Sequence, residues 1–226
     1  MNLGTERAFE NNDKLTLVYC FIFLVITFVK LKYPKMFWGL LRCLYSKNVF
    51  LDFSKELQKV FSVFKSLIFI VQNLIFSVFI YLVTDLSDLK IDVSPDVFFL
   101  KIFIMLTSYL SMHYLFSLMV SKIFNFSEIF KAIRVLKFCY LKIVAFILFP
   151  VLVLFTYLDI ENTKFASILL SSFFLVLLML RVVLLLVKNN NLIFERLFYF
   201  IVYLCTLEIA PTFLIFKVMV KKLYFV

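Results

Sequence analysis

Glycine is almost missing from this chain of 226 residues, which has only Gly4 and Gly39, both outside the long apolar runs. A phosphate-binding P-loop, a Gly-x-Ser-x-Gly nucleophile turn and a Gly-x-x-x-Gly contact between spanning helices all need glycine. Transporters commonly break their helices at glycine and proline, yet the expected spans carry only Pro150 and Pro211. These shortages weigh against nucleotide-dependent enzymes, serine hydrolases and transporters with broken helices.

Cysteine and histidine are also scarce. The single histidine rules out a His-Glu-x-x-His zinc motif, and no two of the four cysteines form a Cys-x-x-Cys pair. The cysteines are Cys20, Cys43, Cys139 and Cys205. We therefore expect no disulfide, no metal site and no cofactor.

What the chain has in excess is apolar residues, which make up 64% of it and give a mean hydropathy of +1.05. A soluble domain has roughly 45–50%, and only lipid can solvate such an excess. A helix needs about 20 apolar residues to cross the hydrocarbon layer. Six runs approach that length: 15–29, 66–84, 97–120, 138–158, 165–187 and 197–216. The sequence predicts an all-α polytopic membrane helix bundle of about six transmembrane helices, in a single integral domain over residues 1–226.

The formal charge of +10 indicates how these helices are oriented. One set of loops and helix ends holds 16 of the basic residues and the other holds 8. Because basic residues gather on the cytoplasmic side, the first set is predicted to be cytoplasmic and both termini periplasmic. The surplus positive charge is then a sign of topology and of anionic lipid, with no nucleic acid as partner.

The first cytoplasmic loop, residues 30–65, reads as an amphipathic interfacial helical segment in two pieces. Apolar residues recur at helical spacing opposite basic and polar ones. The first stripe is Phe37, Leu40, Leu41 and Leu44; the second is Phe53, Leu57, Val60, Phe61 and Phe64. Two compatible interpretations stay open: the stripes lie in the membrane interface beside anionic headgroups, or they pack on the helix bundle.

Two further expectations concern helix ends. Asn125 and Glu128 stand three apart before an apolar run, as in a capping box, so the helix of the fourth span is predicted to begin near Phe126. Lys101 and Lys142 lie about one turn from the predicted ends of their spans and are expected to snorkel to the interface. Neither lysine is given a function.

Glu208 is the most informative polar residue, because it falls within about 3 Å of the middle of the sixth run at 1.5 Å per residue. An ionisable group at that depth calls for a partner. We expect it to face the bundle interior and to pair with Arg181 or, with less support, with His113. The candidate buried polar cluster is Glu208, Arg181, His113, Asn73 and Gln72.

Proline is expected to kink two helices, at Pro150 and at Pro211, where the missing N–H leaves a carbonyl without its donor. The leading interpretation of Glu208 is a buried ion pair that fixes helix packing. A proton or ion relay, a catalytic carboxylate and a protonated, hydrogen-bonded Glu208 remain alternatives.

Two stretches carry a family resemblance. The closing Leu-Cys-Thr-Leu-Glu-Ile-Ala-Pro, residues 204–211, and the opening residues 7–16 resemble an uncharacterised multi-pass inner-membrane family of Bacteroidetes, domain of unknown function 4271. Lys14 stands where an aromatic residue often occurs in that family. The resemblance covers essentially the whole chain. It implies a bacterial inner membrane and makes Glu208 and Pro211 part of a family motif, but it supplies no activity.

We therefore expect a non-enzymatic accessory, scaffold or assembly subunit of an envelope complex, with other envelope membrane proteins as partners. The first alternative is a small proton- or ion-coupled membrane protein centred on Glu208. The second is a lipid-modifying membrane enzyme that uses His113 near the inner leaflet.

Overall fold

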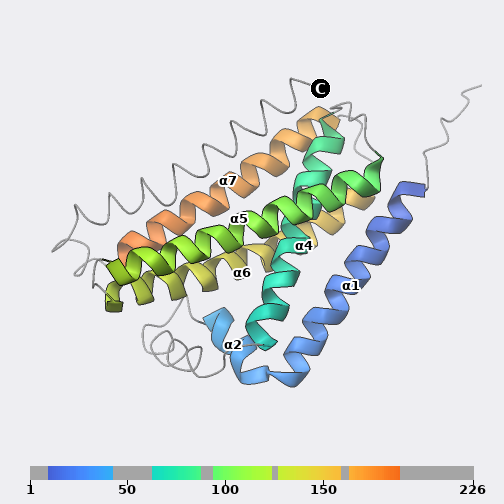
Figure 1. The fold of residues 1–226 in the computed structure, drawn as a ribbon. Coiled ribbons are helices and arrows are strands. Elements are labelled where there is room, and N and C mark those ends of the chain that lie inside the picture. Colours follow the sequence, from blue (N-terminus) through green and yellow to red (C-terminus); the bar gives the residue numbers. More distant parts are fainter. Residues whose placement is uncertain (1–9, 43–62, 88–93, 124–126, 159–162, 189–226) are drawn as a thin grey trace, which may run out of the picture. The chain divides into compact units, whose positions relative to one another are not determined.

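The computed structural model describes residues 10–42, 63–87, 94–123, 127–158 and 163–188, and within them the side chains of 10–12, 116–123, 127–137 and 181–188 are left out. In this part of the chain the ordered elements are all helices (Figure 1). They are α1 (Glu10–Lys32), α2 (Pro34–Arg42), α4 (Val63–Leu86), α5 (Pro95–Ile123), α6 (Ser127–Tyr157) and α7 (Thr163–Lys188).

Five of these helices contain a segment long and apolar enough to cross a membrane, which indicates a membrane-embedded protein. The segments are Asp13–Lys32, Val63–Leu86, Pro95–Leu115, Phe138–Tyr157 and Thr163–Leu180. Each overlaps one of the first five predicted runs. The sixth predicted run, 197–216, lies outside the described residues.

Local sequence explains several helix ends. α1 ends one residue before Tyr33, because the residue that precedes a proline avoids helical backbone angles. Pro34 and Pro95 then open α2 and α5, where a proline has no intrahelical N–H bond to lose. α6 begins at Ser127, one residue from the predicted start near Phe126.

The chain divides into two compact units, and unit 1 contains residues 1–107 and 135–179. Its central element is α4, whose most apolar window is 61% buried, against 22% for that of α1. Ring contacts join α4 to two neighbours: Tyr81 lies 6.3 Å from Phe98 of α5, and Phe79 lies 4.5 Å from Phe174 of α7. Helix α4 also packs along α1. It therefore carries the core of unit 1.

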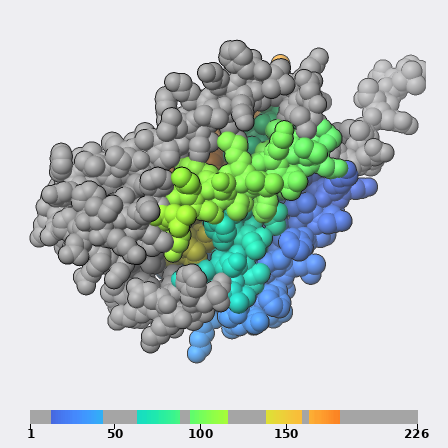
Figure 2. Space-filling view, viewed as in Figure 1, coloured from blue at the N-terminus to red at the C-terminus, as the bar shows by residue number. Residues whose placement is uncertain are grey.

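Helix α1 has one buried side and one exposed apolar side. One stripe of it is buried, at the helical spacing of Leu15, Tyr19, Ile22 and Val29. The opposite side leaves Leu17, Phe23 and Leu24 more than 60% exposed. Figure 2 shows α1 uncovered along its length beside α4. A face this apolar is suited to acyl chains.

The two ends of unit 1 differ in charge. Lys14 of α1 and Asp96 of α5 form an ion pair at 2.7 Å, so the start of α1 and the start of α5 lie at one end of the unit. Two spanning helices, α1 and α4, lie between these two starts in the sequence, so the chain crosses the unit twice before it returns to the same end. We call this the acidic end, where the described charged residues are Asp13, Asp85 and Asp96 together with Lys14 and Lys164. At the other end, the basic end, they are Lys30, Lys32, Lys35, Arg42 and Lys65.

Candidate functional site

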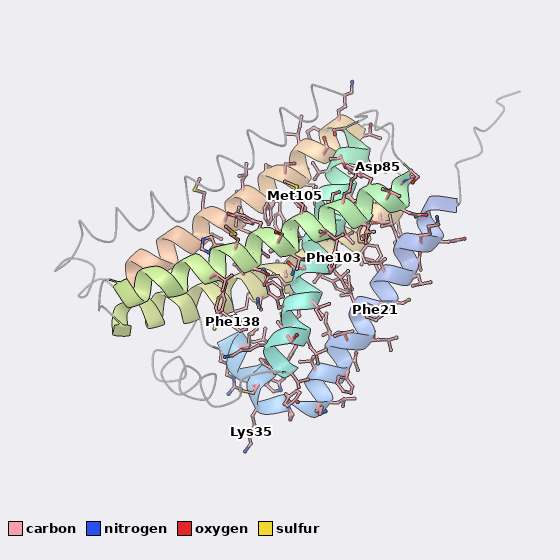
Figure 3. The ribbon with its side chains drawn as sticks, in the orientation of Figure 1. Phe21, Lys35, Asp85, Phe103, Met105 and Phe138 are labelled. Carbon is pink, nitrogen blue, oxygen red and sulfur yellow. The ribbon has the colours of Figure 1, made fainter. Side chains whose placement is uncertain are left out.

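Lys142 is a buried cation inside unit 1, with a relative exposure of 3%. Its ammonium donates a hydrogen bond to Oε1 of Gln72 on α4. Two rings flank the same nitrogen, with centroid distances of 4.3 Å for Phe138 and 5.4 Å for Phe69. Phe138, labelled in Figure 3, is one turn before Lys142 on α6. The structure thus encloses the ammonium between two helices.

The prediction that Lys142 snorkels to the interface is wrong. It rested on the position of Lys142 about one turn from the start of the span at Phe138, and that distance does not tell which side of the helix a neighbour covers. Its side of α6 faces α4 and leaves the ammonium no path to water. Lys101 of α5, which was given the same prediction, is exposed.

The contacts of Lys142 explain how an ammonium is tolerated there. A lysine carries three N–H donors and no acceptor, and an ammonium without compensation is expensive in an apolar medium. The carbonyl oxygen of Gln72 accepts one donor, and the faces of Phe138 and Phe69 attract the charge through their quadrupoles. Among the described residues, this site stabilises a cation without using a carboxylate.

Three polar side chains of α4 are buried next to one another in its middle: Gln72, Asn73 and Ser77, at 2%, 1% and 0% exposure. Ser77 donates its hydroxyl to the backbone carbonyl of Asn73 at 2.8 Å. Oδ1 of Asn73, by contrast, has no hydrogen-bond partner in the described part of the chain. A buried acceptor without a partner costs free energy, and no described contact of Asn73 Oδ1 offsets this cost.

The structure describes only part of the predicted cluster. Gln72 and Asn73 are buried, and Gln72 is joined to Lys142, which the prediction did not include. His113 lies on α5 in unit 2, half-buried, with its ring 6.2 Å from that of Tyr109. Arg181 belongs to α7, but its side chain is outside the described residues, as are Glu208 and Pro211. The pairing of Glu208 stays a prediction.

Pro150 lies inside α6 and is exposed. The helix continues through it to Tyr157. Proline inside a spanning helix is tolerated because neighbouring groups can satisfy the carbonyl that loses its donor. The kink predicted at Pro150 stays a prediction.

A second set of polar contacts joins α1 to α6 near the acidic end. The hydroxyl of Tyr19 is 2.7 Å from Oγ1 of Thr156 and 3.4 Å from the carbonyl of Leu152. One turn earlier on α1, Thr16 pairs with Tyr157 at 2.5 Å. Sequence reasoning missed these pairs, although hydroxyl residues near the ends of apolar runs are a usable signal for helix pairing.

The described residues hold no group of three or more His, Cys, Asp or Glu that could bind a metal ion. What they bring together is an ammonium, two amides and aromatic faces. Such a set can hold helices in register or attract an anionic group. It supplies no pair of acid and base within the described part.

Comparison with known proteins places the chain in a family. The sequence pattern of the family described as "Domain of unknown function (DUF4271)" matches residues 15–219. The chain belongs to this family. No curated protein and no solved structure matches the DUF4271 chain. The match covers α1 from residue 15 onward, the other four spanning helices, α2 and the predicted sixth run, and the family description names no activity.

Proposed function

We propose that this DUF4271 protein is a non-enzymatic accessory, scaffold or assembly subunit of a membrane complex in the bacterial envelope. The observation that carries the proposal is the enclosure of Lys142: a buried ammonium lies between α4 and α6, against Gln72, Phe69 and Phe138. Tyr19 and Thr156 likewise pair between α1 and α6. Polar groups that join one helix to another are expected in a subunit whose role is structural.

The membrane and the orientation belong to the same proposal. We place the protein in the inner membrane with six spans and with the basic end in the cytoplasm, because lysine and arginine accumulate on that side. If the buried Lys142 is left out of the cytoplasmic count, 15 basic residues still stand against 8. Both termini are then periplasmic.

Cysteine labelling tests the orientation. Asn2→Cys and Val226→Cys, each introduced singly after the native cysteines are replaced, should react in intact cells with a reagent that enters only the periplasm. A cysteine at Lys32, at the basic end, is the matched control and should react only after the inner membrane is opened. Protection of both terminal cysteines in intact cells would reverse the orientation.

The accessory role is tested by purification from native membranes. A tagged full-length chain in mild detergent should bring down a reproducible, stoichiometric membrane partner that an unrelated tagged six-span protein does not. Mass spectrometry identifies the partner. A clean monomer obtained at several detergent strengths would contradict the accessory role.

One observation favours a second candidate, an ion- or proton-coupled protein centred on Glu208. Asn73 offers a buried carbonyl oxygen without a described partner, on the same helix as the Gln72 that binds Lys142. A membrane-embedded carboxylate near such groups would resemble a relay site. Glu208→Gln decides: loss of proton or ion flux with the fold intact supports the relay, and unchanged flux and cell phenotype dismiss it. The lipid-modifying alternative that uses His113 remains a prediction from sequence.

A further inference from the structure

Helix α2 presents a basic stripe to the outside of unit 1. Lys35, Trp38 and Arg42 are three and four residues apart, so their side chains share one face of the helix. All three are exposed, Trp38 to 51%. Lys35 points away from the helices in Figure 3. We call these three residues the α2 stripe.

The opposite side of α2 anchors it to the bundle. Met36 and Leu40 are buried, Leu40 completely. Phe37 places its ring 5.7 Å from that of Phe146 on α6. One turn before Phe37, the ring of Tyr33 lies edge-on to Phe64 at the start of α4. The α2 stripe is therefore carried on a helix that is held on its apolar side.

The cations around the stripe are not neutralised within the described chain. The structure pairs none of Lys30, Lys32, Lys35 and Arg42 with a carboxylate of the described residues. Two of them lie over aromatic rings instead: Arg42 is 6.0 Å from the Trp38 ring, and Lys32 is 5.5 Å from the Phe28 ring. Lys14 at the acidic end, by contrast, has Asp96. Lys30, Lys32, Lys35 and Arg42 thus carry positive charge that the described chain leaves for an external anion.

We propose that the α2 stripe, together with Lys32, binds the phosphate of an anionic phospholipid headgroup. The end of a spanning helix lies at headgroup depth, and α2 follows the last residue of α1 after a single intervening residue. Tryptophan prefers that depth. A guanidinium binds phosphate oxygens through its fork of N–H donors, and an ammonium adds point charge. A lipid satisfies the charge and the apolar contacts of α1 at once, which a free phosphate ion does not.

Trp38 allows the site to be observed directly, because it is the chain's only tryptophan. The full-length protein is reconstituted into phosphatidylcholine vesicles that contain either brominated phosphatidylglycerol or brominated phosphatidylcholine. Bromine quenches the fluorescence of a tryptophan that it contacts, so the ratio of the two quenching curves gives the relative binding constant of the anionic lipid at Trp38. The proposal expects a clear preference for phosphatidylglycerol that decreases as salt is added.

Neutralising the site should remove that preference stepwise. Lys35→Gln and Arg42→Gln are each expected to lower the relative binding constant about fivefold, which corresponds to about 1 kcal/mol per basic residue near an anionic surface. Lys164→Gln and Lys101→Gln, exposed lysines on α7 and α5, are the matched controls and should change nothing. Monodisperse elution and an unchanged helical spectrum confirm that each variant is folded.

Two results would overturn the proposal. Equal quenching by both brominated lipids would show ordinary acyl contact without recognition of the headgroup. A preference that inorganic phosphate abolishes, at an ionic strength where chloride does not, would show a site for free phosphate. Neither result depends on whether the protein is an accessory subunit, so this proposal and the proposed function fail separately.

Discussion

Two lysines of unit 1 differ in their exposure and in the kind of partner that stabilises the ammonium. Lys142, in the middle of the unit, is 3% exposed and binds a neutral amide and two aromatic faces. Lys14, at the acidic end, has a side chain that is 62% exposed and binds the carboxylate of Asp96. The buried ammonium of Lys142 is bound by neutral groups, and the exposed ammonium of Lys14 is bound by a negatively charged carboxylate. Burial, not the formal charge of the partner, should therefore decide how much each contact contributes to stability.

The largest expected effect is at Gln72. Gln72→Leu removes the acceptor and leaves the Lys142 ammonium buried without it, so the free energy of unfolding should fall by about 2–3 kcal/mol. Far-UV circular dichroism during detergent-driven unfolding of the purified protein measures the change.

The double variant with Gln72→Leu and Lys142→Met is the control for this prediction. It replaces both polar groups by apolar ones of similar size and should recover most of the lost stability. A single Gln72→Leu change within about 0.5 kcal/mol of the parent protein would mean that the Lys142 contact does not stabilise the bundle.

The neighbouring amide should respond with the opposite sign. Oδ1 of Asn73 is buried without a described partner, so Asn73→Leu removes a desolvated group and should raise the free energy of unfolding by up to about 1 kcal/mol. The same unfolding assay compares it with Gln72→Leu. A loss of stability would show that Asn73 has a partner among the residues that the structure does not describe.

These two amides show what could be predicted from sequence. Gln72 and Asn73 stand out because they interrupt an apolar run, and a polar residue in a span must face the bundle. The five described spans follow from length and apolar content alone, and α6 begins one residue from the start predicted near Phe126.

The burial of Lys142 could not be predicted in the same way. Sequence gives a residue's distance from a helix end, but not which side of the helix a neighbour covers. Lys101 and Lys142 had the same predicted distance, and packing against α4 separated them. The Tyr19–Thr156 pair was missed for a related reason, since its residues are 137 positions apart and only tertiary packing joins them.

A smaller effect is expected at Tyr19, which is 6% exposed and so nearly as buried as Lys142. Tyr19→Phe keeps the ring contact with Phe149 and removes the hydroxyl that bonds Thr156. Hydrogen bonds between membrane helices contribute about 0.6 kcal/mol on average, so a loss of that size is expected. Tyr33→Phe is the matched control, because Tyr33 packs edge-on to Phe64 through its ring, and it should leave stability unchanged.

The smallest effect on stability is expected at the acidic end, for the ion pair between Lys14 and Asp96. Lys14→Gln should lower the free energy of unfolding by no more than about 0.5 kcal/mol, because water and salt screen a pair whose side chains are more than 60% exposed. Lys14 makes further interactions, so a double-mutant cycle with Asp96→Asn isolates the coupling between the two side chains. That coupling should shrink towards zero as salt is raised. A coupling as large as the loss in Gln72→Leu, and insensitive to salt, would show that exposure does not separate the two lysines and that the acidic end is as closed as the middle of unit 1.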